Sequence, residues 1–445
     1  MSCLNFDADT FFLSGSKRGY SSREEHVKSV YKLLLQHYWD SKIESFRLWV
    51  PDYYPWLYID DMIMDEVRKE RPKDYDQIGD DDHNASYIWI RSAIQMGAEE
   101  LNFIYADNVR YIEKTFSFEI ILSGLLTSKL KHLRLQKCSI AKASNDIHDQ
   151  PILHSLATLE LDDVPVDETA LGSIFFTCVN LWKLVLRKCK FPPNLTIVGP
   201  INLKCLQIFS PVKLNKLQVS AAKLTYFEYQ STSLITKLSF SNVPKLEEML
   251  LNIQPANQKV DDMFTDFATD APQLKRLMSL HTTLDFKLEP RIPVTSTILC
   301  QLEQLELILG DWKYCNLLKM IPILVACPLL QKFQLIASGR PTNVPDMQYP
   351  SNKHPFPNLK EVQIRTFYAS SSEIPFVFYM LENAVALDRM ILDTTPKSCR
   401  DCKIKNLAHE LPNHQIRAKV ASPTAKLVFQ HHSNERIYFA KIFIR

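Results

Sequence analysis

The stretch Leu130-Lys-His-Leu133-Arg-Leu135-Gln-Lys-Cys138 returns in nearly the same form at Leu181-Trp-Lys-Leu184-Val-Leu186-Arg-Lys-Cys189. A shorter copy, Leu156-Ala-Thr-Leu159-Glu-Leu161, lies between them. Apolar and polar residues alternate at the end of each copy, which predicts a short strand with leucines on one face and polar residues on the other. One such strand cannot bury its leucines alone, so the copies are expected to stack side by side in a parallel sheet.

The spacing of the second apolar position divides the repeats into three groups. It steps by 26, 25 and 22 residues from Leu133 to Leu206, by 10 or 11 from Leu206 to Met249, and by 28 or 29 from Met249 to Met390. The long steps leave room for a helix between strands, whereas the short steps predict strands joined by tight turns. The candidate helices are residues 260–269, 314–326 and 374–383, and degenerate first strands are expected near residues 43–48 and 101–103.

The phrase with its trailing cysteine matches the leucine-rich-repeat signature, in which Cys138 and Cys189 would occupy a buried turn position. The predicted fold class is therefore α/β, a leucine-rich-repeat solenoid with a parallel sheet on the concave face and helices or irregular coils on the convex face. The predicted organisation is an N-terminal segment with a capping helix at 1–40, a solenoid at 41–395 with an insert at 60–82 and closing repeats at 351–395, and a tail at 396–445.

Composition favours an interaction scaffold. The formal net charge of +2 gives no general attraction to nucleic acid or to an anionic membrane, and no apolar run reaches the ~20 residues of a membrane span. Asp7 and Asp9 interrupt the first apolar residues, so no secretory signal peptide is expected. Ten cysteines without such a signal predict reduced thiols and a nuclear or cytoplasmic location.

Several local patterns resemble catalytic or metal-binding motifs without completing them. The segment His409-Glu-Leu-Pro-Asn-His414 spaces its histidines by five residues rather than four, and Pro412 would break the required helix. Cys399 and Cys402 have no second Cys or His pair at zinc-finger spacing. With only nine glycines, the chain contains no phosphate loop or dinucleotide fingerprint. We therefore predict no cofactor, no metal and no catalytic residue, although an enzyme with a site on the insert or the tail is the competing class.

One position of the repeat is rich in basic residues. Directly before the second apolar residue, Lys and Arg outnumber Asp and Glu by six to two. If all strands stack in register, these residues form a discontinuous basic column that suits an acidic or phosphorylated protein segment. The other interpretation is that lysine only solubilises a strand-rich surface. The candidate protein-binding residues are Lys183, Lys216, Lys237, Arg276 and Lys332.

Residues near both ends of the repeats resemble a known family. The stretches His354-Pro-Phe-Pro-Asn-Leu359, Phe367-Tyr368 and Asn383-Ala-Val-Ala-Leu387 look like the closing repeats of plant F-box/leucine-rich-repeat proteins of the meiotic F-box type, which are related to FBD-containing proteins. The segments Ile43-Glu-Ser-Phe46 and Trp89-Ile90 resemble that family's first repeats. On this resemblance, the similarity covers roughly residues 4–395.

The resemblance implies a non-enzymatic, substrate-recognising part of an SCF-type ubiquitin ligase, with an unknown target protein on the concave face. In this family an F-box preceding the repeats binds the ligase's Skp adaptor. Only five residues precede Phe6, so the F-box is expected to be absent and adaptor binding is doubtful. A chain of this kind could instead compete with an F-box-bearing relative for the same target.

Overall fold

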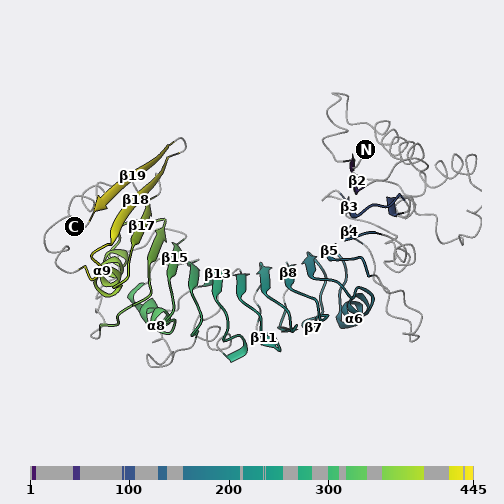
Figure 1. The fold of residues 1–445 in the computed structure, drawn as a ribbon, viewed down its shortest axis with the longest axis horizontal. Helices are drawn as coiled ribbons and strands as arrows, with labels where there is room; N and C mark the ends of the chain where they lie inside the picture. The colour runs from purple at the N-terminus through teal and green to yellow at the C-terminus, as the bar shows by residue number, and fades with distance from the viewer. Residues whose placement is uncertain are drawn as a thin grey trace, which may run out of the picture. The chain divides into compact units, whose positions relative to one another are not determined.

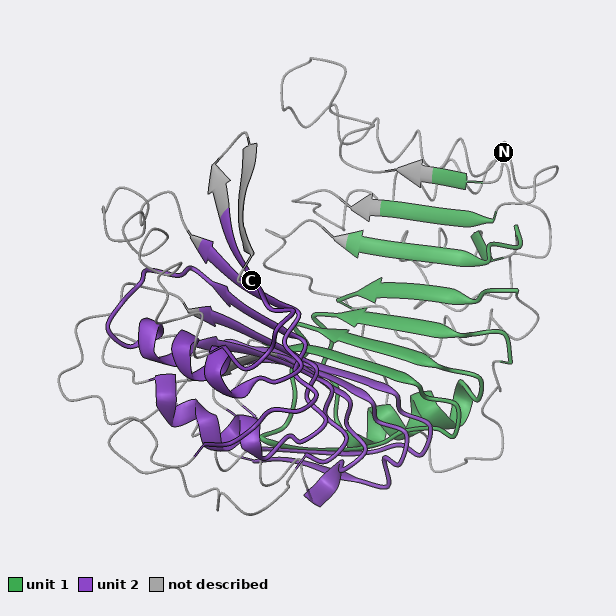
Figure 2. Ribbon diagram, turned by 60° about the vertical axis from the view of Figure 1, so that its left-hand side comes forward, with its two compact units in different colours: residues 1–212 green, residues 213–445 purple. Residues whose placement is uncertain are grey.

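The computed structural model describes residues 3–6, 44–50, 93–94, 96–105, 129–137, 154–210, 214–233, 235, 237–253, 269–282, 299–309, 317–337, 353–394, 420–433 and 436–443. The chain forms two compact units, Met1–Val212 and Lys213–Arg445, which are coloured separately in Figure 2.

Unit 1 is built on a sheet of parallel strands that follow one another as neighbours (Figure 1). In order, the strands are β1 (Cys3–Phe6), β2 (Ser45–Val50), β3 (Glu100–Tyr105), β4 (His132–Gln136), β5 (Thr158–Asp162), β6 (Lys183–Arg187) and β8 (Cys205–Ser210). A helix, α6 (Glu168–Thr177), follows β5, and it contacts β7 (Asn194–Val198), which lies outside this sheet. The N-terminus of α6 is capped by Asp167, whose Oδ1 accepts a hydrogen bond from the Ala170 N–H at 2.8 Å.

Unit 2 repeats this plan with longer connections. Its main sheet contains β10 (Tyr226–Ser231), β12 (Glu248–Ile253), β13 (Arg276–Thr282), β14 (Gln304–Leu309), β15 (Lys332–Ala337), β16 (Glu361–Arg365), β17 (Arg389–Thr394), β18 (Lys426–Ser433) and β19 (Arg436–Phe443). All neighbours are parallel except β18 and β19, which are antiparallel. Two further strands, β9 (Lys216–Ser220) and β11 (Lys237–Ser241), pair with each other in a second sheet. The helical segments are η3 (Leu317–Met320), α8 (Ile321–Val325) and α9 (Glu373–Asn383).

A repeated backbone contact keeps the strands of each main sheet in register. At the start of a strand, one carbonyl oxygen accepts hydrogen bonds from two successive N–H groups of the next repeat, as the Ala157 oxygen does from Trp182 and Lys183. The Lys275 oxygen accepts in the same way from Glu303 and Gln304 in unit 2. Because this contact recurs from repeat to repeat, equivalent side chains lie opposite one another across neighbouring strands.

The leucines of the motif form the core. Leu133, Leu159, Leu184 and Leu305 are each no more than 2% exposed. Helix α9 packs on this leucine side, because its Phe376 ring makes an edge-to-face contact with Phe333 of β15 at a centroid distance of 6.2 Å. The predicted solenoid class and the three strands predicted from the leucine phrase, β4, β5 and β6, are therefore confirmed, although each strand begins two residues after the first leucine of its phrase.

The expected helices, the insert and the end of the solenoid have different outcomes. The helix expected at 374–383 is α9, and the one expected at 314–326 is described from residue 317 as η3 followed by α8. The helix expected at 260–269 lies almost entirely outside the described residues, as do the insert at 60–82 and the capping helix before residue 40. The sheet does not stop at residue 395, because β18 pairs in parallel with β17.

Candidate functional site

Each main sheet has a second face, opposite the leucines, which we call the open face. On β5 it carries Thr158, Glu160 and Asp162, the residues that alternate with buried Leu159 and Leu161. The strand register continues these positions into rows that run across the sheet of each unit. This face presents closely spaced side chains of known order, which is the arrangement needed to recognise an extended partner.

The structure divides the predicted basic column. Lys183 lies on the open face of unit 1, and Arg276 and Lys332 lie at the equivalent row of the unit 2 sheet. Lys216 and Lys237 do not belong to either main sheet. They are direct partners of each other on β9 and β11 of the second sheet. The expectation of a single column of five is therefore wrong in its geometry, because successive short repeats alternate between two sheets.

In unit 2, acidic residues of the same row neutralise much of the basic charge. Arg276 Nη1 lies 2.9 Å from Glu248 Oε1, and Lys332 Nζ lies 2.9 Å from Glu361 Oε1. Arg389 pairs with the second oxygen of Glu361. These partners occupy adjacent strands, so the row forms ion pairs between repeats. Exposed pairs of this kind contribute little to stability, about 0 to 1 kcal/mol each, but they leave little free positive charge.

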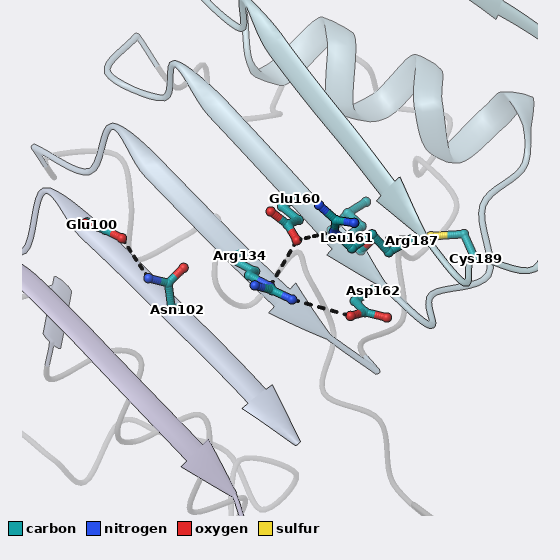
Figure 3. A network of polar contacts seen from close by, with 8 residues as sticks. All are labelled: Glu100, Asn102, Arg134, Glu160, Leu161, Asp162, Arg187 and Cys189. Atoms are coloured by element: carbon teal, nitrogen blue, oxygen red, sulfur yellow. Dashed lines mark hydrogen bonds and ion pairs between the residues drawn. The ribbon is translucent and has the colours of Figure 1, made fainter. Parts of the chain in front are cut away.

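The open face of unit 1 carries a more connected polar network (Figure 3). Glu160 on β5 lies between two arginines, with its Oε1 3.1 Å from Arg134 Nε of β4 and 2.7 Å from Arg187 Nε of β6. The contact with Arg187 is a hydrogen bond, whereas the contact with Arg134 is an ion pair only. Three neighbouring strands are thus joined through one carboxylate.

Asp162, at the end of β5, is a buried member of this network with unsatisfied hydrogen-bonding capacity. Its side chain is 8% exposed, and its Oδ2 lies 3.6 Å from Arg134 Nη2, beyond hydrogen-bond distance. Among the described residues, Oδ1 has no hydrogen-bond partner. Burial raises the pKa of Asp162, although the positive charges of Lys188 and Arg134 oppose that rise.

Arg187 is held from two sides. Its Nε donates to Glu160, and its guanidinium carbon lies 4.2 Å from the centroid of the Phe209 ring of β8. A guanidinium over an aromatic face is a favourable cation–π contact. The Arg187 side chain is nevertheless 36% exposed. The site therefore presents a fixed but accessible arginine at the carboxyl ends of β6 and β8.

Cys189 is a structural residue in this neighbourhood. It is fully buried, its Sγ donates to the Leu161 carbonyl oxygen at 3.5 Å, and burial raises the pKa of its thiol to about 12. The buried turn position predicted for it is confirmed, whereas Cys138 lies outside the described residues. The thiol is protonated near neutral pH and is not a nucleophile.

The other chemical motifs lie in parts of the chain that are not described, namely Cys399, Cys402, His409 and His414. Among the described residues, no three His, Cys, Asp or Glu side chains are gathered as a metal site. Within the same residues, no helix is both long and apolar enough to cross a membrane.

The sequence analysis did not identify Arg187 or Phe209. It also did not identify two asparagines whose side-chain amides donate hydrogen bonds to a carbonyl oxygen of the preceding repeat. Asn180 Nδ2 donates to the His154 oxygen at 2.8 Å, and Asn358 Nδ2 donates to the Pro328 oxygen at 2.9 Å. For Arg187 and Phe209, the repeat spacing contains a signal that could have identified their contact. The step of 22 residues from Leu184 to Leu206 places Phe209 directly opposite Arg187.

Comparison with known proteins agrees with this architecture. A search of curated proteins finds no match to the chain. The family model described as the At1g61320/AtMIF1 LRR domain matches residues 67–432, which is most of the sequence and spans the strands from β3 to β17. The chain belongs to the At1g61320/AtMIF1 leucine-rich-repeat domain family.

Proposed function

We propose that this chain is a non-enzymatic scaffold that holds a target protein on the open face of its leucine-rich-repeat sheets. The observation that carries the proposal is the strand register, which arranges the open-face side chains in ordered rows within each unit. Rows of this kind suit recognition of another protein's side chains, since each row position is set independently by one repeat.

The chemistry of the rows favours a protein partner over nucleic acid. On the open face of unit 2, Leu250 pairs with Met278, and beyond a register shift in β13 the next row reads Glu306, Gln334, Gln363 and Ile391, so acidic, amide and apolar residues are mixed. Binding a phosphate backbone requires many uncompensated Lys and Arg residues. On the open face of unit 2, Arg276 and Lys332 are paired with carboxylates.

At a finer level, we propose that the chain recognises targets for an SCF-type ubiquitin ligase in the nucleus or cytoplasm. Support comes from the resemblance of residues 354–393 to the closing repeats of F-box/leucine-rich-repeat proteins. A second role, in which the chain competes with an F-box-bearing relative and protects the target, uses the same open face.

Depleting the chain from cells distinguishes these two roles. A recruiting subunit lowers the amount of its target, so depletion raises target abundance, and blocking the proteasome in undepleted cells raises it similarly. A competitor protects the target, so depletion lowers its abundance. Purification of the tagged 445-residue chain first identifies the proteins that bind it, and the Skp adaptor and cullin are detected in the same purification. Quantitative mass spectrometry then measures the cellular abundance of these proteins with and without depletion of the chain. Unchanged abundance of every co-purifying protein would reject both ligase-linked roles.

A further inference from the structure

The open face of unit 1 contains an arginine whose position is fixed before any partner arrives. Arg187 is hydrogen-bonded through Nε to Glu160 at 2.7 Å and lies over the Phe209 ring at 4.2 Å. Long side chains normally lose rotamer freedom on binding, and this loss weakens the binding. For Arg187 that ordering has already occurred in the folded chain, which favours its use as a binding anchor.

The guanidinium retains unused hydrogen-bonding capacity. It carries five N–H donors in a planar fork. Within the described part of the chain only the Nε group is engaged in a hydrogen bond, so the Nη1 and Nη2 groups are available. The side chain is 36% exposed, which makes these donors accessible from the open face. An acceptor that fits them has two oxygens in one plane, as a carboxylate does.

The surrounding charges decide which anion fits. Glu160 lies in direct contact with the guanidinium, and Asp162 is the cross-strand partner of Arg187. A phosphate dianion would be repelled by both acids, whereas a single negative charge is repelled less. Arg134 pairs with Glu160 and Asp162, and the positive charge of Lys188 also acts on Asp162, so these residues offset part of that repulsion.

We propose that Arg187, clamped by Glu160 and Phe209, anchors an Asp or Glu side chain of a protein segment bound on the open face of unit 1. This inference rests on the proposed function and names the chemistry that one site recognises. The bound carboxylate accepts from the Nη groups of Arg187 while Glu160 keeps the Nε hydrogen bond. Binding at this anchor differs from binding by the predicted basic column, because it depends on a guanidinium held in position and not on net charge.

The structure offers matched variants for a test. Arg187→Gln removes the charge and the fork, and Arg187→Lys keeps the charge without the fork. Phe209→Leu keeps Arg187 but removes the aromatic ring beneath it. Arg365 is the control, since it is the last residue of β16 as Arg187 is of β6, and it is exposed. Among the described residues, no ion pair or ring contact holds Arg365.

The experiment selects random peptides displayed on phage with the immobilised full-length chain and counter-selects them with Arg187→Gln. Enriched peptides are expected to share an Asp or Glu. Synthetic copies should bind Arg187→Gln at least about tenfold more weakly than the wild type, in the range of an interface anchor. Arg187→Lys and Phe209→Leu should show smaller losses, and Arg365→Gln should show none. Thermal unfolding shows whether each variant is folded. If Arg187→Gln does not fold, binding by the wild type is compared with binding by Arg187→Lys and Phe209→Leu.

Peptide variants complete the test. Replacing the shared acid by Gln should weaken binding to the wild type and have no additional effect with Arg187→Gln, whereas replacing it by phosphoserine should not strengthen binding. Tighter binding of the phosphoserine peptide would overturn the choice of a carboxylate. Equal losses for Arg187→Gln and Arg365→Gln, with no effect of Phe209→Leu, would show attraction by charge alone and overturn the anchor.

The remaining outcomes separate this inference from the proposed function. The selection could enrich peptides that lack Asp and Glu and whose binding is blocked by Gln207→Arg, a change on the open face of β8. That result would reject the anchor but would still support the scaffold role. A failure to enrich any peptide would also reject the anchor. Peptides whose binding responds to neither Arg187 nor Gln207 variants would count against both proposals.

Discussion

The loop that precedes α9 depends on one buried carboxylate. Glu373 is 0% exposed, and it accepts a hydrogen bond from the Ser370 N–H at 2.8 Å and a bifurcated one from the Tyr368 N–H at 3.1 and 3.2 Å. The carboxylate thus satisfies two N–H groups of a loop in which Thr366 and Ala369 have positive φ angles of 60° and 55°. Such angles are unfavourable for residues with a Cβ, and for β-branched Thr366 above all. Burial raises the pKa of Glu373 to about 7, although the two N–H donors oppose the rise.

The raised pKa predicts a specific pH dependence of stability. Folded Glu373 binds a proton more tightly than the unfolded chain, whose reference pKa is 4.5. Between pH 4.5 and about 7, the contribution of this residue to the free energy of unfolding therefore rises as pH falls. Glu373→Gln cannot titrate there. The wild type should gain stability relative to this variant as pH is lowered from above 7, by at most about 1.4 kcal/mol per pH unit.

Urea unfolding of both proteins over this pH range measures the difference. Subtracting the variant's curve from the wild type's removes the contribution of all other titrating groups, as long as they lie far from Glu373. A difference that stays constant with pH, or that increases as pH rises, would contradict the assignment of a buried, proton-binding carboxylate.

At the scale of the element, the leucine phrase determines which residues are buried. Leu305 of β14 is 1% exposed, and its neighbour Gln304 lies half-buried on the open face of the same strand. Leu305→Asp would bury an unpaired carboxylate and should destabilise unit 2 by several kcal/mol. Gln304→Asp places the same group one residue away, where water reaches it, and should cost about 0.5 kcal/mol or less. Thermal unfolding monitored by circular dichroism compares the two, and an unchanged melting temperature for Leu305→Asp would contradict the assigned register.

The same phrase explains what could and could not be predicted from sequence. Alternation identified β4, β5 and β6, because a strand buried on one face requires it. It could not assign β9 to the second sheet, since Lys216-Leu-Gln-Val-Ser220 alternates as Cys205-Leu-Gln-Ile-Phe209 does. Strand β18 was overlooked because its Leu427 lies 37 residues after its partner Met390, outside the regular spacing.

The polar network of unit 1 was hidden for a related reason. Glu160 and Arg187 are 27 residues apart and match no local motif. They meet because one repeat of 25 residues, plus two positions along the strand, makes them diagonal neighbours. The alternation fixed which side chains share the open face, but the choice of Glu160 over Asp162 as the partner of Arg187 depends on side-chain geometry that only the structure supplies.

At the scale of the whole molecule, the two units use one construction. In each, hydrogen bonds to a shared carbonyl oxygen align the strands, the leucines form the core on one side, and mixed polar and apolar residues occupy the open face. The proposed function assigns specificity to the order of side chains along each row, with a fixed arginine in unit 1 and paired charges in unit 2.

Site-specific photo-cross-linking in cells tests the open face most directly. A photoreactive amino acid is placed at Gln207 on the open face of unit 1, at Gln363 on the open face of unit 2, or at exposed Thr169 on α6. A partner protein held on the open face is expected to be cross-linked from Gln207 or Gln363 and not from Thr169. Cross-linking from Thr169, with none from either open-face position, would contradict it.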